Sequence, residues 1–188
     1  MAARMRPVYL QLLRLELRRV AGRVGLPGLD EFLQRCAQAF RSPDFLVLIL
    51  LEQAKLRLHF GEWEECLHLL DEIQLHDHLL EPYDKGAYYL LSARLHHGYG
   101  DINQALAFIE MALSESSGDT EVEAQIEMGA LFNRIGERER GAEFLGLAQE
   151  SLETIHNPEL ESRLAFERGL ELLRAERIGE ELEAIDLS

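Results

Sequence analysis

Three turns of similar sequence divide the middle of the chain. In each, a stretch with helical periodicity ends at a glycine that is followed by an acid: Gly61-Glu62, Gly100-Asp101 and Gly136-Glu137. Glycine readily adopts the left-handed conformation that ends many helices, and an acid is favoured beside the positive end of the next helix. The glycines stand 39 and 36 residues apart. A helix pair of this length cannot bury its apolar faces alone, so the spacing predicts stacked helix pairs.

Helical periodicity extends over the rest of the chain. In the first segment the apolar residues recur at spacings of three and four: Leu10, Leu13, Leu17, Val20 and Val24. This spacing places them on one face of a helix. Further helices are expected over residues 29–40, from about Pro43 to Phe60, and over residues 157–177. Because the alternating pattern of strands is nearly absent, we predict an all-α protein of about nine or ten helices.

Residues 47–155 resemble three tetratricopeptide repeats, whose pattern is W-x2-L-G-x2-Y in the first helix and A-x3-F in the second. The matching residues are Ala54, Gly61, Trp63, Cys66 and Leu70 in the first unit, Tyr89, Ala93, Gly100, Ala105 and Ile109 in the second, and Met128, Gly129, Phe132, Gly136, Gly141 and Leu145 in the third. Small residues at the paired positions let two helices cross closely. The resemblance implies a right-handed α-α superhelix, a solenoid.

The expected solenoid forms a single domain over residues 1–188. Residues 1–42 would form a divergent helix pair, residues 43–155 the three repeat units, and residues 156–188 a capping helix and tail. The repeats are degenerate, because Arg57 and His96 stand where the pattern has tyrosine, and the late proline is displaced to Pro82 and Pro158. We expect Trp63 to wedge between paired helices; an exposed role at an interface is the alternative.

The charge of the chain argues against one class of partner. The formal net charge is −15, and affinity for nucleic acid comes mainly from clustered Lys and Arg, so we expect no direct nucleic-acid binding. Residues 1–23 are basic, with six arginines and one glutamate. We favour a role for this segment in covering the open end of the stack. The alternatives are self-association through its leucines and contact with an acidic surface.

The apolar runs in the sequence are short. The longest, FLVLILL from Phe45 to Leu51, is far below the roughly 20 residues that cross a bilayer. Charged residues also interrupt the first leucines, so a signal peptide is not indicated. We therefore expect a cytoplasmic protein without a membrane span. Cys36 and Cys66 lack CxxC or Cys/His spacing, which favours buried thiols.

Motifs for catalysis and cofactor binding are missing from the sequence. It contains no nucleophile elbow, phosphate loop or dinucleotide-binding fingerprint. The group His76, Asp77 and His78 is too closely spaced for its histidines to share one helix face. We therefore expect no enzyme activity, no cofactor and no metal site.

The tetratricopeptide resemblance also implies a concave groove lined by the first helix of each pair. In this register the groove residues are Lys55 and His59 in the first unit, Arg94 and His97 in the second, and Asn133 and Arg134 in the third. This mostly basic set suits an extended acidic peptide or a free carboxyl terminus, held by charge-assisted hydrogen bonds. The alternative is that Lys55 and Arg94 merely pair with neighbouring acids.

These patterns predict a non-catalytic scaffold that binds a partner protein or peptide in a locally basic groove. A chaperone-tail clamp, which some members of the family form, is not expected, because in this register several of the positions that need Lys, Asn and Arg hold Leu51, Leu91, Glu123 and Glu127. The alternative function is the sensory or effector part of a bacterial transcriptional regulator or signalling complex, and an enzyme comes third. A homodimer is a further expectation, since the apolar edge of a solenoid favours association.

Overall fold

The computed structural model describes residues 28, 30–36, 38 and 43–186 of the chain. Helices dominate these residues, which contain no strand. The all-α prediction is therefore confirmed for this part of the protein, whereas the superhelical arrangement and the single domain remain predictions. Contacts divide the chain into two compact units, Met1–Leu80 and Glu81–Ser188, which are described separately below. None of the described helices is long and apolar enough to cross a membrane.

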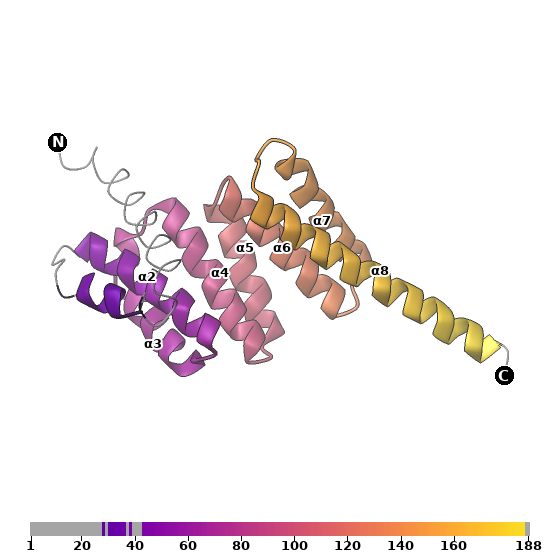
Figure 1. The fold of residues 1–188 in the computed structure, drawn as a ribbon, viewed down its shortest axis with the longest axis horizontal. Helices are drawn as coiled ribbons and strands as arrows, with labels where there is room; N and C mark the ends of the chain where they lie inside the picture. Colours follow the sequence, from indigo (N-terminus) through magenta and orange to yellow (C-terminus); the bar gives the residue numbers. More distant parts are fainter. Residues whose placement is uncertain (1–27, 29, 37, 39–42, 187–188) are drawn as a thin grey trace. The chain divides into compact units, whose positions relative to one another are not determined.

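The first unit is built around one helix pair. Residues 28, 30–36 and 38 are helical, and they precede α2 (Pro43–Phe60), α3 (Trp63–Gln74) and the short 3₁₀-helix η1 (Asp77–Leu79) (Figure 1). Helices α2 and α3 pack against each other. Apolar side chains fill the interior: Leu33, Val47, Leu51, Ala54, Cys66, Leu70 and Ile73. Cys66 is 0% exposed, and burial raises the pKa of its thiol to about 11.

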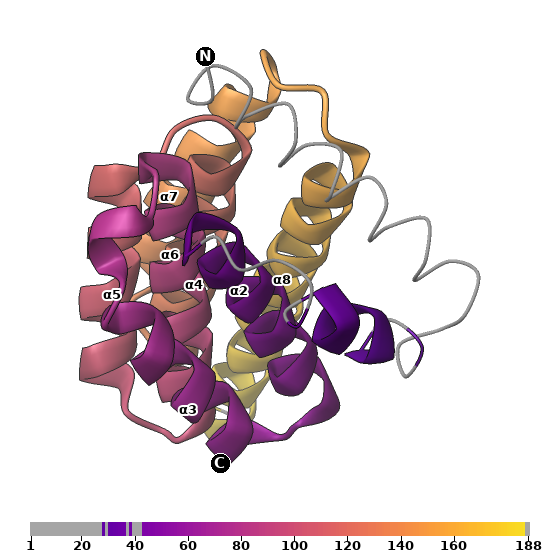
Figure 2. The same ribbon diagram turned by 90° about the vertical axis from the view of Figure 1, so that its left-hand side faces the viewer.

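The second unit contains five α-helices in the described part of the chain: α4 (Pro82–Gly98), α5 (Ile102–Glu115), α6 (Asp119–Arg134), α7 (Arg138–Leu152) and α8 (Pro158–Asp186). Helix α4 pairs with α5, and α6 pairs with α7, while α5 also packs on α6. One buried apolar cluster joins α4, α5 and α6, and another joins α6, α7 and α8. Figure 2 shows α8 to one side of α4–α7, and in Figure 1 it continues past α7.

The three glycine turns share one backbone geometry. Gly61, Gly100 and Gly136 have φ values of 75°, 82° and 88°, in the left-handed region. In each turn the next residue donates its backbone N–H to the carbonyl oxygen five positions earlier, over 2.9 Å: Glu62 to Arg57, Asp101 to His96, and Glu137 to Phe132. This bond satisfies a carbonyl that the end of a helix leaves unpaired. The same local device therefore ends α2, α4 and α6.

Small residues lie at the helix crossings. The positions that the repeat pattern assigns to them are buried: Ala54, Cys66, Ala93, Ala105, Gly129 and Gly141. At the α6–α7 crossing, a Cβ on Gly129 would lie 2.8 Å from the side chain of Leu145. A Cβ on Gly141 would lie 2.1 Å from Oδ1 of Asn133 and 3.0 Å from the carbonyl oxygen of Gly129. The two glycines therefore allow α6 and α7 to approach closely.

Two departures from the repeat pattern have a structural explanation. Arg57, at a tyrosine position, donates to Oδ1 of Asp30 at 2.5 Å and to Oε2 of Glu62 at 2.6 Å. It therefore joins α2 to the preceding helical residues and to the turn that follows. His96, at the other tyrosine position, stacks on Phe108 with ring centroids 5.2 Å apart. Its imidazole thus packs as a flat ring between α4 and α5.

Candidate functional site

Four charged side chains from three helices of the second unit form an ion-pair cluster. Arg94 of α4 donates through Nε to Oε1 of Glu127 at 2.5 Å, and through Nη2 to Oε1 of Glu123 at 2.6 Å. Arg163 of α8 donates to the same two carboxylates of α6, with a distance of 3.1 Å to Glu123. The formal charges of these four residues, which we call the closed cluster, cancel.

Charge pairing outweighs burial within the closed cluster. Burial alone would raise the pKa of Glu127, but the guanidinium groups of Arg94 and Arg163 lower it to about 2. Burial likewise opposes the charge of Arg94, yet Glu127 and Glu123 raise the pKa of its guanidinium. Both groups are therefore ionised near neutral pH. Because Arg94 already satisfies two carboxylates inside the molecule, it has little capacity to bind a third from a partner.

A more accessible pair, which we call the open pair, consists of Arg134 and His97 at the C-terminal ends of α6 and α4. Nη1 of Arg134 lies 3.2 Å from Nδ1 and 3.1 Å from Nε2 of His97. Among the described residues, the carboxylate nearest to Arg134 is that of Glu167, at 3.9 Å. The Arg134 side chain is 40% exposed. The cation in this pair is therefore only weakly compensated.

The imidazole of the open pair has a perturbed pKa. Burial is the main cause that lowers the pKa of His97, and the charge of Arg134 adds to it, against the opposite effect of Glu127. His97 is therefore mostly neutral at pH 7, and its ring accepts a hydrogen bond from Arg134. A carboxylate placed beside this ring would shift its pKa upwards, because an opposite charge favours the protonated form.

The space between the closed cluster and the open pair is too small for a ligand. Its volume is about 10 Å³, room for about one water molecule. It is lined by Arg94, Glu127, His97 and Arg134 together with apolar side chains. Across the residues that the structure describes, no three His, Cys, Asp or Glu side chains are grouped to hold a metal ion. The open pair therefore offers a surface contact rather than a cavity for a small molecule.

Asn133, which we expected beside Arg134 in the groove, lies inside the second unit. Its side chain is buried against Gly141 at the α6–α7 crossing. Among the described residues Oδ1 of Asn133 has no hydrogen-bond partner, and it faces α7 at Gly141. Consecutive helical residues point about 100° apart, which explains why Arg134 reaches the surface and Asn133 does not.

Two of the candidate groove residues, Lys55 and His59, belong to the first unit. Nζ of Lys55 lies 2.7 Å from Oε1 of Glu52 on the same helix. Lys55 thus pairs with a neighbouring acid, which was the alternative to a free groove cation. His59 is exposed near the end of α2, where its ring packs edge-on against that of Phe60 at 5.9 Å. Exposed pairs of the Lys55 kind contribute little to stability. Neither residue is part of a larger polar group in the described structure.

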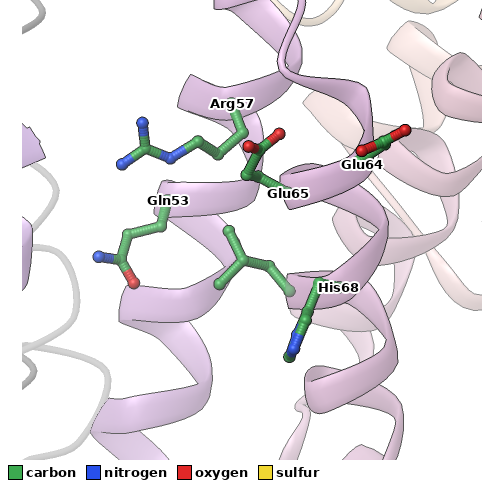
Figure 3. A pocket seen from close by; sticks show the side chains of 6 residues that line it. Gln53, Arg57, Glu64, Glu65 and His68 are labelled. Carbon is green, nitrogen blue, oxygen red and sulfur yellow. The ribbon is translucent and has the colours of Figure 1, made fainter.

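A cleft of about 460 Å³ lies between α2 and α3 of the first unit, and it was not predicted from the sequence. Figure 3 shows Gln53 and Arg57 on one helix and Glu64, Glu65 and His68 on the other. The guanidinium of Arg57 is already held by two carboxylates. The helical spacing of residues 53 and 57 signals a shared face, but not that this face remains open.

The half-buried Trp63 is the first residue of α3, and its Nε1 lies 3.6 Å from where a Cβ on Gly61 would stand. The indole therefore covers the turn between α2 and α3. This arrangement gives the aromatic residue a local packing role, while part of its surface remains accessible.

The described part of the chain is all-α and contains repeated helix pairs, and its second unit carries two charged groups, the closed cluster and the open pair. Comparison of the sequence with protein-family models gives no match, and comparison with curated proteins gives none either. The tetratricopeptide relationship therefore remains a resemblance, which rests on the residue pattern. Function must accordingly be inferred from the site itself.

Proposed function

We propose that the protein is a non-catalytic scaffold that binds an acidic segment of a partner protein at the open pair. The observation that supports this proposal is the different pairing of two arginines. Arg94 contacts two carboxylates at 2.5 and 2.6 Å, whereas the Arg134 side chain is 40% exposed and its nearest described carboxylate lies at 3.9 Å. Arg134 is thus the better-placed cation for a carboxylate from another molecule.

The chemistry of the open pair fits such a ligand. A guanidinium has five N–H donors in a planar fork, which matches the two oxygens of a carboxylate. His97 lies at the same position on the surface, and it gains a second donor if a bound carboxylate promotes its protonation. The closed cluster supports the site indirectly, because it joins the helices α4 and α6 on which both residues stand.

The proposal is tested by titrating fluorescent acidic peptides against the full-length protein. We expect Arg134→Gln to weaken binding about tenfold, the effect of losing one charge-assisted contact. Arg140→Gln is the matched control, because Arg140 is an exposed arginine of α7 that pairs with Glu137; it should leave the affinity unchanged. Equal affinity of the wild type for acidic and neutral peptides, or an unchanged Arg134→Gln variant, would contradict the proposal.

A further inference from the structure

The outer face of α8 carries large apolar side chains that remain mostly exposed in the described structure. Phe166, Leu172 and Leu173 are 63%, 66% and 64% exposed. The opposite face of the same helix holds Leu160, Leu164 and Glu167, which are buried. Helix α8 therefore has two apolar faces, and only one of them is buried within the second unit.

A glycine stands at the centre of this exposed face. Gly169 is in the interior of α8, and a Cβ added to it would meet no atom within 4 Å. Glycine costs a helix about 1 kcal/mol relative to alanine, and neither a turn nor a close contact within the second unit requires it here. A glycine on a helix surface allows another helix to approach closely.

The residues around Gly169 are arranged symmetrically. Ala165 and Phe166 precede the glycine by four and three residues, and Leu172 and Leu173 follow it by three and four. Ala165 is exposed as well. We infer that α8 is a self-association surface, on which a second copy of this chain docks antiparallel with the two helices crossing at Gly169. We call residues 165–173 the α8 seam.

The symmetry of the α8 seam favours a second copy over another helix. A two-fold interface requires one surface that fits itself. In the antiparallel crossing, Ala165 faces Leu173 of the partner subunit, and Phe166 faces Leu172 of the partner subunit. The small alanine leaves room for the larger leucine, and the paired glycines let the helix axes approach.

The local charge of α8 is compatible with the docking of a second copy of the chain. Residues 164–174, which exclude Arg163 of the closed cluster, contain two arginines and two glutamates, a balance of zero, although the whole chain carries −15. Two copies therefore meet at the α8 seam without the strong like-charge repulsion expected elsewhere on the protein. A strongly basic or acidic partner helix, by contrast, gains little electrostatic attraction at this position.

The size of the α8 seam sets the expected strength of the association. The three large side chains expose roughly 350 Å² of apolar surface per copy, if a fully exposed side chain of this kind offers about 180 Å². Two copies would bury roughly 700 Å² of it, below the ~1,200 Å² of a standard interface. The dimer should therefore be weak and should form in a concentration-dependent way.

The test is sedimentation velocity of the full-length protein from about 5 to about 500 μM. The wild type should shift from monomer towards dimer, and Phe166→Glu should raise the dissociation constant at least about tenfold. Leu147→Glu is the matched control, because Leu147 is an exposed apolar residue of α7 outside the α8 seam; it should leave the association unchanged. A wild type that stays monomeric throughout, or a dimer that Phe166→Glu does not weaken, would overturn the inference.

A second variant and a cross-linking experiment test the geometry. A Cβ on Gly169 meets no atom within 4 Å in the monomer, and leucine is a good helix former. Gly169→Leu should therefore keep the helical circular dichroism signal while weakening the dimer about tenfold or more; an equally strong Gly169→Leu dimer would refute the glycine crossing. In mixtures, Ala165→Cys should form a disulfide with Leu173→Cys, and each variant alone should form far less. Preferential like-with-like cross-links would show a parallel dimer instead. Arg134→Gln should not change the association, so the inference stands or fails independently of the proposed partner site.

Discussion

The closed cluster and the open pair each contain an arginine on the first helix of a helix pair, α4 for Arg94 and α6 for Arg134. The two arginines differ in what surrounds them. Arg94 is held by carboxylates of α6 that belong to the same unit. Arg134 contacts a neutral imidazole, and its nearest described carboxylate lies 3.9 Å away. An arginine on a predicted groove face is therefore available to a partner only if the helices of its own unit leave it without a close carboxylate.

The strongest test of this difference removes each arginine in turn. Arg94→Met should destabilise the protein by about 2–3 kcal/mol, because Glu127 would lose one of its two guanidinium partners while it stays largely buried. Arg134→Gln should cost less, about 1 kcal/mol, since the Arg134 side chain is 40% exposed and its ion pair with the buried Glu167 is long, at 3.9 Å. Denaturant unfolding of both variants measures the two free energies.

A double variant provides the control for this test. Replacing Arg94 and Glu127 together by methionine should recover most of the lost stability, because neither charge is then left uncompensated. Arg163 still pairs with Glu123 in that variant. Similar small losses for Arg94→Met and Arg134→Gln would remove the distinction between the two groups.

Acid should weaken the closed cluster. The pKa of Glu127 is lowered from its ordinary value of 4.5 to about 2, so the stability it provides is complete above about pH 4.5 and is lost as the pH falls towards about 2. The shift corresponds to about 3 kcal/mol. The difference in unfolding free energy between wild type and Glu127→Gln, measured from pH 6 down to about pH 2, should shrink over this window. A constant difference would show that the carboxylate is not held as described.

Asn133 lies in the interior of the second unit and its neighbour Arg134 lies on the surface, so packing and binding can be tested separately. Gly141→Ala should destabilise by about 2 kcal/mol, because the new methyl group would overlap Asn133 and approach the backbone of Gly129. Gly146→Ala in the same helix meets nothing within 4 Å, so it should stabilise by about 0.5–1 kcal/mol. Peptide binding at the open pair should be the same in folded Gly141→Ala as in wild type. A neutral Gly141→Ala variant would disprove the close crossing.

The smallest expected effect is the pH dependence of partner binding. A bound carboxylate raises the pKa of His97, which is lowered in the free protein, so binding takes up a proton and strengthens as the pH falls. We expect an affinity about threefold higher at pH 6 than at pH 8. His97→Gln should abolish this dependence while Arg134 still binds. An equally steep pH profile in the variant would place the titrating group elsewhere.

The sequence predicted those features that depend on neighbouring residues. Gly61, Gly100 and Gly136 occupy left-handed turns because a helix stop is a local event. Pairing of Arg94 with acids was one of the two alternatives, but the sequence did not identify these acids, since Glu123 and Glu127 lie 29 and 33 residues away and meet it only through packing of α4 on α6.

Only part of the candidate site was predicted from the sequence, and the reason is different here. Arg134 and His97 come together as members of one expected face, but placing Asn133 on that face ignored the 100° turn between adjacent helical residues. Lys55 shows a second limit, because any exposed helix with an acid three residues away offers a partner that the repeat pattern does not reveal. The apolar α8 seam was missed for a third reason, since periodicity alone does not show which of two apolar faces is covered.

Burial of the thiols makes the first unit chemically distinguishable from the second. Both cysteines of the chain, Cys36 and Cys66, belong to residues 1–80, and burial raises the pKa of each. With a pKa of about 11, the Cys66 thiol is ionised in only roughly one molecule in 10⁴ at pH 7. A thiol reagent can therefore modify it at an appreciable rate only when the first unit opens. The labelling rate thus reports the opening of one half of the protein, while helical circular dichroism reports both.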